Sequence, residues 1–244
     1  MVIFLNVLRF LPNILFIAAF LLLLVASNVR MAFNSLAFYE WEFARQRVDV
    51  VTNLSLEQLG DAGRQVRSYF NSDKEPLDVQ VVIDGEQTPL FDERETVHMG
   101  DVKQLVQRVY RVQEGCFLFL FLWVTWGFFA QGSDFIPRLR RLFLLASVLS
   151  MVIVGAVGLV AMVAFEPVFV LFHQLSFANN LWMLDPRTSF LLQMFPEQFW
   201  IEATVLIGAS TIAESLAVAV ALTTLGWWRQ HQIKVAQAKL PQFT

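Results

Sequence analysis

Four long stretches of this chain contain almost no charge, and they limit its possible folds more than any other feature. They span residues 10–29, 115–133, 142–165 and 203–228, and only the last contains a charged residue, Glu214. A helix needs about 20 apolar residues to cross about 30 Å of hydrocarbon at 1.5 Å per residue. Continuous apolar runs favour helices over the alternating strands of a membrane barrel. We therefore expect four transmembrane helices.

The composition agrees with a membrane protein and excludes several other classes. Apolar residues make up 56% of the 244 residues and charged residues 16%, whereas soluble domains are about 45–50% apolar. The net charge of −3 offers no basic surface, so we expect no nucleic-acid partner. The single cysteine, Cys116, lies inside the second apolar run, where we expect a structural role rather than a nucleophile.

The first and last apolar runs each allow one further inference. The first is longer than the about 7–15 apolar residues of a signal peptide, and no A-x-A cleavage site follows it, so we expect a retained helix. Glu214 falls in the middle of the fourth run, where an ionised carboxylate is costly in hydrocarbon. We expect its side chain to face the helix bundle and to be neutral or paired.

Positive residues in the short connections predict the orientation of the chain. Arg138, Arg140 and Arg141 follow the second apolar run, whereas the segment after the third run is mainly acidic. Basic residues also flank the two ends of the chain, at Arg9, Arg229, Lys234 and Lys239. Since Lys and Arg are enriched in cytoplasmic loops, we expect both termini to be cytoplasmic.

The sequence thus predicts an α-helical polytopic membrane protein with a small extracytoplasmic α+β cap and an aromatic interfacial loop. The expected order is a first transmembrane helix at 1–29, an extracytoplasmic cap at 30–114, a second helix at 115–133, a cytoplasmic loop at 134–141, a third helix at 142–165, an extracytoplasmic interfacial loop at 166–202, a fourth helix at 203–228 and a cytoplasmic tail at 229–244.

Local patterns in the expected cap predict two helices and a hairpin. Ser55 and Gln58 form a capping-box pattern before a helix over about 55–70. The run VQVVI at 79–83, followed by an Asp-Gly pair at 84–85, is typical of a hairpin with a two-residue turn. Asp92 with Glu95 three residues later indicates the start of another helix.

The expected outer loop 166–202 is unusual because it combines aromatic residues with few charges. Its prolines at 167, 186 and 196 argue against one long helix. Aromatic side chains with few charges are typical of the headgroup region of a bilayer. We expect this loop to lie on or dip into the outer leaflet, in contact with membrane lipid.

Two of the three histidines fall in the two expected outer segments. His98 lies between Glu95 and Asp101 at helical spacing, and His173 lies in the aromatic loop. Each alone could be an ordinary polar or interfacial residue, and we expect that role for His231 in the tail. Because titratable groups that converge from distant segments are typical of a functional site, we expect His98 and His173 to meet.

The distance of His98 from the second apolar run conflicts with a membrane-level site. His98 precedes residue 115 by 17 positions, so a straight helix along the membrane normal would raise it about 25 Å above the lipid. We therefore expect a bend near Glu114 and Gly115, a helix that lies flat, or a membrane span that begins near Val109.

Two motifs resemble those of the bacterial lipoprotein intramolecular transacylase (Lit) family of integral membrane proteins. The first is E-x-x-H-M-x-D-V-K, which runs from Glu95 to Lys103. The second is F-H-x-x-x-F-x-N-x-x-W-x-L-D-P, which runs from Phe172 to Pro186 and is followed by Phe195-Pro196-Glu197. Their order and spacing also resemble the family.

The resemblance implies an acyl migrase without a cofactor. Its substrate would be a lipoprotein whose N-terminal cysteine carries a diacylglyceryl thioether and a free α-amine. The enzyme would move the sn-2 acyl chain to that amine, giving an N-acyl lyso-form lipoprotein.

The proposed reaction suggests roles for the motif residues. The α-ammonium, with a pKa of about 8, must lose a proton, the oxyanion needs donors and the glycerol oxygen needs a proton. We assign the base to His98, oriented by Glu95 or Asp101, and the acid or oxyanion donor to His173, although the two could exchange roles. Further candidates for the oxyanion, the headgroup or support of the site are Lys103, Asn179, Trp182 and Asp185.

Two other functions explain the same residues. In a metal-dependent membrane hydrolase, two histidines and two carboxylates (His98, His173, Glu95 and Asp101) would form the metal shell, although the chain has no H-E-x-x-H motif. In a non-enzymatic membrane sensor or assembly module, the cap would bind protein and neither histidine would be required.

Overall fold

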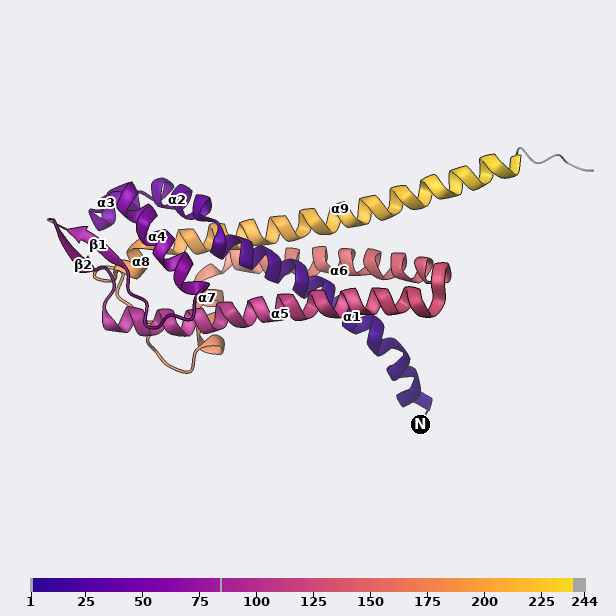
Figure 1. Cartoon of the computed structure of the whole chain (residues 1–244), viewed down its shortest axis with the longest axis horizontal. Helices are drawn as coiled ribbons and strands as arrows, with labels where there is room; N and C mark the ends of the chain where they lie inside the picture. Colours follow the sequence, from indigo (N-terminus) through magenta and orange to yellow (C-terminus); the bar gives the residue numbers. More distant parts are fainter. Residues whose placement is uncertain (1, 84, 239–244) are drawn as a thin grey trace, which may run out of the picture.

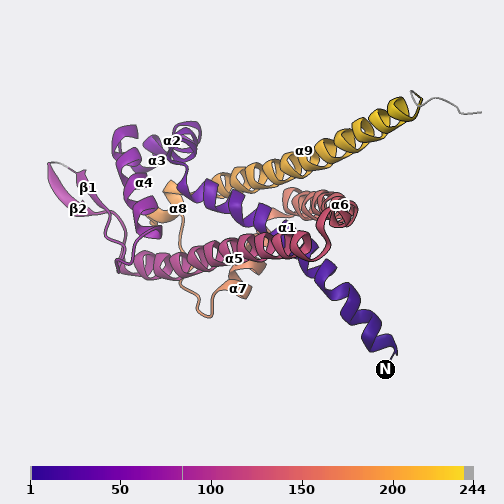
Figure 2. The ribbon, with the colours of Figure 1, turned by 45° about the vertical axis from the view of Figure 1, so that its right-hand side comes forward.

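A computed structural model describes the backbone of residues 2–83 and 85–238 and the side chains of residues 11–83 and 85–232. Four long helices dominate it: α1 (Val2–Asn34), α5 (Glu93–Gln131), α6 (Phe135–Val163) and α9 (Glu197–Ala238). Figure 1 shows that these helices extend in roughly the same direction, with the shorter elements gathered at one end. Figure 2 shows the N-terminal part of α1 diverging from the other long helices.

Five short helices and two strands lie at that end of the long helices. They are α2 (Leu36–Arg45), α3 (Val48–Thr52), α4 (Leu56–Phe70), α7 (Phe165–Ser176) and α8 (Phe190–Met194), together with strands β1 (Gln80–Ile83) and β2 (Glu86–Pro89). A single 3-10 turn, Gly132–Asp134, joins α5 to α6.

Within the described residues, three helical stretches are long and apolar enough to cross a membrane. They are Leu11–Asn34, Glu93–Val163 and Glu197–Gln232. The middle stretch has 71 residues and contains both α5 and α6, which fold back on each other at the 3-10 turn. The expected loop 134–141 is therefore largely the first turns of α6.

The long helices pack in two principal pairs, α1 against α5 and α6 against α9. Phe16 and Phe20 of α1 pack edge to face on Phe143 of α6, with ring centroids 5.0 and 5.5 Å apart. By contrast, Phe129 and Val163 leave 85% and 80% of their surface exposed. Large apolar side chains on an outward surface are expected where the surrounding solvent is lipid.

The cap elements form as their local sequence predicts. Ser55 and Gln58 make both bonds of the capping box at the start of α4. The two strands pair antiparallel, with Ile83 opposite Glu86, which gives the expected hairpin; Asp84 lies outside the described residues. Gly85 has a φ of +85°, a conformation that glycine adopts without steric cost.

The cap is held by one apolar core that joins segments distant in sequence. The core includes Tyr39 and Phe43 of α2, Leu59 and Val66 of α4, Met99 and Val106 of α5, and Phe195 and Phe199 near the start of α9. The core of the cap therefore combines residues of α2, α4, α5 and α9. This common core fixes the relative positions of the two outer segments.

Helices α2 and α3 lie within residues 30–54, where the sequence pattern allowed no secondary-structure prediction. The Ser35 hydroxyl accepts a hydrogen bond from the Phe38 amide at 3.2 Å and so caps α2. Arg47 and Asn53 adopt left-handed conformations at the two ends of α3. These short helices lack the long periodic pattern on which sequence-based assignment depends.

Helix α5 continues without a break past Glu114 and Gly115, where a bend was one of the expected arrangements. It is one helix from Glu93 to Gln131, it begins with the capping box of Asp92 and Glu95, and Gly115 lies within it. No proline interrupts this range, so nothing in the sequence forces a kink. The apolar surroundings instead extend upward along the helix to His98, as described below.

Glu214 accepts a hydrogen bond from another helix, as expected, but its side chain is exposed rather than enclosed by the bundle. The side-chain amide of Asn28 donates to Glu214 at 2.9 Å and to the Thr211 hydroxyl at 3.1 Å. Asn28 and Thr211 are both buried. This group of hydrogen bonds joins α1 to α9.

Of the basic residues used to orient the chain, the side chains of Arg9, Lys234 and Lys239 lie outside the described residues.

A second polar group joins the cap helix α2 to the start of α9. Glu42 is fully buried, and the Gln46 amide donates to it at 3.2 Å. Glu202 accepts hydrogen bonds from Gln46 at 3.5 Å and from Arg45 at 2.6 Å. Burial raises the pKa of Glu42 to about 7, the bond from Gln46 opposes this change, and the nearby Glu202 carboxylate adds to it.

The raised pKa of Glu42 predicts that the protein loses stability as the pH rises. Between about pH 4.5 and 7 the folded protein keeps a proton on Glu42 that the unfolded chain has released, so the free energy of unfolding falls across this window. At pH 8, Glu42→Gln removes the cost of an ionised carboxylate buried beside Glu202, because a neutral amide can donate to Glu202. We expect the melting midpoint in detergent to rise by about 2–4 °C per kcal/mol gained.

The matched control is Glu40→Gln on the same helix, because Glu40 is exposed and its ion pair with Arg64 spans 3.7 Å. It should leave the midpoint and its pH dependence nearly unchanged. If Glu42→Gln behaved like Glu40→Gln at pH 8, the raised pKa of the buried Glu42 carboxyl would be contradicted.

Candidate active site

An apolar cavity of about 450 Å³ lies where the cap meets the long helices. Its walls come from the end of α1, from α2, α4 and α5, from the end of α6, from α7, α8 and the segment between them, and from α9. Its lower part is lined by Val29, Val109, Val157 and Ile207, which belong to or border the apolar runs. The cavity therefore extends from the cap into the part of the molecule expected to lie in lipid.

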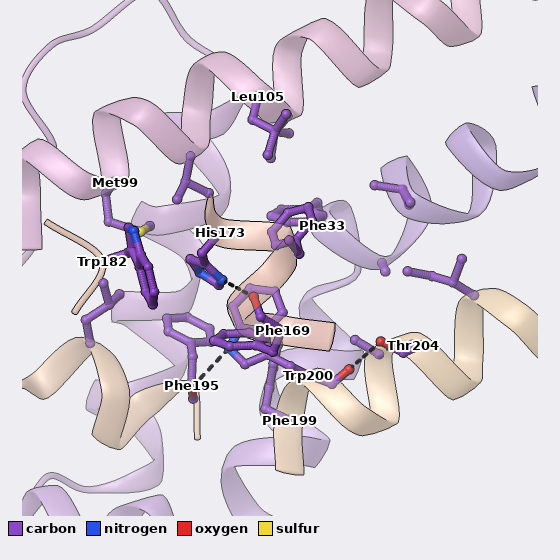
Figure 3. Close-up of a pocket in the computed structure, with 18 of the residues that line it drawn as sticks. Phe33, Met99, Leu105, Phe169, His173, Trp182, Phe195, Phe199, Trp200 and Thr204 are labelled. Atoms are coloured by element: carbon purple, nitrogen blue, oxygen red, sulfur yellow. Dashed lines mark hydrogen bonds between the residues drawn. The ribbon is translucent and has the colours of Figure 1, made fainter. Parts of the chain in front are cut away.

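The two histidines paired by the sequence analysis meet in this cavity. His98 lies on α5 and His173 on α7, and their ring centroids are 6.1 Å apart. Both side chains are buried. Phe177 packs against both of them, with its ring 5.2 Å from His98 and 5.5 Å from His173. Figure 3 shows His173 surrounded by aromatic side chains of the cavity.

The fold positions His173 through the local structure of α7. Pro167 lies in the first turn of this helix, where a missing amide hydrogen is tolerated. His173 lies one helical turn after Phe169, and its Nδ1 is 2.8 Å from the Phe169 carbonyl oxygen (Figure 3). A carbonyl oxygen can only accept, so Nδ1 bears the hydrogen and Nε2 of the neutral ring bears the lone pair.

Burial keeps both imidazoles neutral near pH 7. It lowers the pKa of His98 to about 4, and the neighbouring His173 adds to this effect while Asp101 opposes it. Burial also lowers the pKa of His173, against the hydrogen bond to Phe169. A neutral imidazole can accept a proton at one nitrogen and donate from the other.

Three other polar side chains of the cavity wall donate to backbone carbonyls. The Tyr39 hydroxyl donates to Phe33 at 3.0 Å, the Trp200 indole to Phe195 at 3.1 Å and the Thr204 hydroxyl to Trp200 at 2.8 Å. Among the residues that the structure describes, the wall contains no carboxylate, lysine or arginine. The buried Nδ1 of His98 has no hydrogen-bond partner among residues 11–83 and 85–232. Proton transfer inside the cavity therefore depends on the two imidazoles.

Glu95 does not orient His98 in this structure, contrary to the sequence-based expectation. Its buried carboxylate accepts hydrogen bonds from the Ser189 hydroxyl at 2.5 Å, the Leu191 amide at 2.9 Å and the Asp92 amide at 2.8 Å. These bonds fix the start of α5 to the start of α8. Glu95 thus supports the site by joining two outer segments.

Asp101 also binds the other outer segment rather than His98. Its carboxylate accepts a hydrogen bond from the Asn179 side-chain amide at 2.8 Å, and the Asn179 oxygen in turn accepts from the Leu181 amide at 3.0 Å. Asn179 is exposed and is not part of the cavity wall. Asn179 was expected to contact the reacting groups. In the structure it instead joins its own segment to α5 through Asp101.

Lys103 lies on a different side of α5 from the histidine. Its ammonium group donates to the Lys74 carbonyl at 2.5 Å, lies 3.2 Å from the Glu75 carboxylate and packs 4.1 Å from the centre of the Tyr69 ring. These contacts hold the chain between α4 and β1. The structure does not place Lys103 in the cavity, so it gives no support for a role at an oxyanion.

The remaining motif residues lie in the segment between α7 and α8. The Trp182 ring packs 4.9 Å from the His173 ring at an interplanar angle of 37° and lines the cavity. Asp185 is exposed and binds Arg187 through its side chain at 2.7 Å; Arg187 lowers the pKa of this carboxyl. Asp185 shapes the turn before α8 and does not line the cavity.

Sequence reasoning missed Arg94. Its guanidinium donates to three backbone carbonyls of the segment that contains Trp182, those of Asn180, Leu181 and Met183. The sequence offers no signal for these contacts, since an arginine in the acidic first turn of a helix is typical of a solvated surface residue.

The four residues of the possible metal shell do not form one. Within the described parts of the chain, no three His, Cys, Asp or Glu side chains gather closely enough to hold a metal ion. Glu95 and Asp101 both direct their oxygens at the segment after α7, as described above. The donor set that the hydrolase alternative requires is thus divided between two places.

Comparisons with known proteins agree on one family. The model of the family described as lipoprotein intramolecular transacylase Lit matches residues 14–200. The solved structure of the membrane-integral lipoprotein intramolecular transacylase Lit from Bacillus cereus is similar at a TM-score of 0.76 and 16% identity, over 93% of this chain and 99% of that chain. At this identity the similarity shows the fold.

Two further structures of the Bacillus cereus protein, each with one histidine replaced, match at a TM-score of 0.72 and 16% identity. One covers 95% of this chain and 97% of its own, the other 94% and 99%. A search of curated proteins found no match.

The hydrogen bonds of Glu95 predict that its loss weakens the fold. In Glu95→Gln the amide nitrogen faces hydrogen-bond donors, so at least one bond is lost in a buried place at a cost of about 1–3 kcal/mol. We expect a lower melting midpoint in detergent. Glu93→Gln, at an exposed position in the same turn, should have little effect.

The same pair of variants separates anchoring from orientation of His98. An anchor leaves the pKa of His98, measured by NMR titration, low in the folded protein. A fall of that pKa in Glu95→Gln with an unchanged midpoint would contradict the anchoring role, because a carboxylate that orients an imidazole raises its pKa.

Proposed function

Because this chain belongs to the lipoprotein intramolecular transacylase Lit family and is therefore a membrane acyltransferase, we propose that it moves an acyl chain within a diacylglyceryl-modified lipoprotein. The chain leaves the sn-2 glycerol oxygen and joins the α-amine of the same N-terminal cysteine. The product is an N-acyl lyso-form lipoprotein. The observation that supports this most strongly is the pair of buried, neutral imidazoles in an otherwise apolar cavity.

The cavity suits a lipid substrate whose reacting groups are polar and whose chains are not. Its lower wall of valine and isoleucine side chains favours hydrocarbon, because burying apolar surface is worth about 25 cal/mol per Å². The histidines lie at the upper end, where the ester and the amine would sit. Holding one molecule in a folded conformation can supply several kcal/mol toward the reaction.

The reaction requires two proton transfers around one tetrahedral intermediate. The free amine attacks the ester carbonyl carbon, a C–N bond forms, and a base removes one proton from the nitrogen. The C–O bond to glycerol then breaks, and an acid gives the departing oxygen a proton. An ester and an amine become an amide and an alcohol, with no oxidant or cofactor consumed.

The hydrogen bond from His173 to Phe169 suggests which imidazole is the base. It fixes the Nδ1 hydrogen and leaves the Nε2 lone pair available. We therefore assign the base to His173 and the acid to His98, which reverses the assignment made from the sequence. The proton that His173 takes from the amine replaces the one that His98 gives to the glycerol oxygen, so both rings end neutral. Trp182 and Phe177 exclude water beside the pair, which strengthens electrostatic interactions within the cavity.

We further propose that four helices cross the bacterial cytoplasmic membrane, with the site on the extracytoplasmic side and both termini in the cytoplasm. The arginines at 138–141 and the acidic segment after α6 support this orientation. In intact cells of a Cys116→Ala background, Asp73→Cys should react with an impermeant maleimide and Ser133→Cys should not. The opposite labelling pattern would invert the topology.

The alternative of a metal-dependent hydrolase is less well supported, because its four ligands do not converge. Family membership also replaces the non-enzymatic alternative, since the family is one of transacylases. Chelation therefore should not reduce the activity of the purified protein.

The direct test is to express the chain in bacteria that lack lipoprotein N-acylation. The transfer leaves the total mass unchanged, so tandem mass spectrometry of a lipoprotein N-terminal peptide must locate the acyl chain. We expect the N-acyl lyso form with the unmodified chain, and at least a 100-fold loss with His98→Ala or His173→Ala. His231→Ala is the matched control, since His231 is exposed and packs on Trp227.

An absence of the N-acyl form at normal expression would refute the function. Full activity of either histidine variant would refute the two-imidazole mechanism.

A substrate with a better leaving group should separate the two histidines. When sulfur replaces the sn-2 oxygen, the departing thiol has a pKa of about 8.5 and needs little help from an acid. We expect this thioester to restore much of the activity of His98→Ala but little of that of His173→Ala. The reverse pattern would exchange the two roles.

A further inference from the structure

Arg94 makes the most extensive contact between α5 and the segment that covers the histidines. Its Nη2 donates to the carbonyls of Asn180 and Met183 at 2.9 and 3.0 Å, and its Nε donates to the carbonyl of Leu181 at 3.3 Å. The residues joined are more than 80 positions apart in the sequence. A planar guanidinium is suited to several convergent acceptors because its donors have a fixed geometry.

The segment that Arg94 binds has little structure of its own. Between the end of α7 and the start of α8, residues 177–189 form no helix or strand. Its internal backbone bonds are confined to short turns, such as Met183 to Asn180 and Ser189 to Asp185. A segment of this kind depends on contacts with neighbouring elements to keep one conformation.

This segment places two aromatic rings on the imidazoles. The Trp182 ring lies 4.9 Å from His173, and the Phe177 ring lies 5.2 Å from His98. In Figure 3 the Trp182 ring stands beside His173, with Met99 of α5 next to it. A shift of this segment would therefore act on the proposed site mainly through Trp182, which packs on His173.

We infer that Arg94 is a positioning residue for acyl transfer: by holding the turn at 180–183, it keeps Trp182 packed on His173. This inference rests on the proposed function for its effect on turnover, while the contact itself concerns the resting protein. The hydrogen bond from Asn179 to Asp101 holds the start of the same segment. Arg94 and Asp101 thus hold two successive parts of the cover on one helix.

Loss of Arg94 should expose His173 to water. His173 owes its low pKa to burial, so removing the Trp182 ring allows the pKa to return toward its ordinary value of about 6.5. The titratable group that faces it from α5 is His98, with Asp101 beyond, and α2 contributes Tyr39 to the same wall. Among the described residues, the wall positions on all other elements include no further acidic or basic side chain.

The test compares Arg94→Ala and Arg94→Lys with Arg111→Ala, which removes an exposed arginine from the same helix. One measurement is kcat and KM on a synthetic diacylglyceryl-cysteine lipopeptide with a free amine. The other is NMR titration of the histidine side chains in detergent without substrate. Thermal unfolding is recorded for every variant.

For Arg94→Ala we expect kcat to fall about 10- to 100-fold, because a displacement near 1 Å in a site can cost this much, with a smaller change in KM. We expect the pKa of His173 to rise and the melting midpoint to stay close to that of Arg111→Ala. Arg94→Lys should recover little, since one ammonium cannot reproduce the planar fork.

A wild-type kcat together with an unchanged His173 titration in Arg94→Ala would overturn the inference. So would a loss of kcat that only follows a lower melting midpoint. If the unmodified protein showed no turnover, the proposed function would fail, and the NMR titration would still decide whether Arg94 keeps His173 covered.

Discussion

The structure depends on burying two imidazoles in an apolar cavity at the end of a bundle of apolar helices. An imidazolium is costly in such surroundings, so burial holds His98 and His173 neutral near pH 7. A neutral ring can take a proton from an amine without first releasing one. It also carries an N–H whose proton can be given to a glycerol oxygen. The same apolar surroundings accept hydrocarbon chains. One physical condition therefore serves both the chemistry and the binding of a lipid.

The acidic residues beside His98 illustrate how a motif can combine a reacting group with its support. Glu95 and Asp101 flank His98 at intervals of three residues on α5. The structure uses both carboxylates to hold the segment between α7 and the start of α8, through Ser189, Leu191 and Asn179. His98 is left free to face the cavity. The motif thus joins two distant parts of the chain around the histidine.

Much of the fold could be predicted because its signals are local. Charge-free runs indicated the long helices, and the capping box at Ser55 indicated α4. The pairing of His98 with His173 followed from a topological argument about which segments share one side of the membrane. By contrast, α2 and α3 lack a periodic pattern of sufficient length, and the unbroken course of α5 across the cap boundary was only one of several possibilities.

The residues that hold the site could not be assigned from the sequence, because their roles depend on tertiary contacts. Lys103 belongs to the family-like motif, yet it packs on Tyr69 and Glu75 on another side of α5. Arg94 belongs to no recognised part of either motif, yet it binds three carbonyls across the site. A carbonyl acceptor has no sequence signature, since every residue has one.

The central claim is that the substrate's sn-2 chain occupies the cavity below the two histidines, and photocrosslinking tests it most directly. A diacylglyceryl lipopeptide with a diazirine at the end of its sn-2 chain, and a non-reactive amide in place of the ester, would be bound and irradiated. The account predicts that mass spectrometry finds the label on cavity residues such as Val157 and Ile207. Labelling confined to outward-facing residues such as Phe121 and Val152 would contradict it.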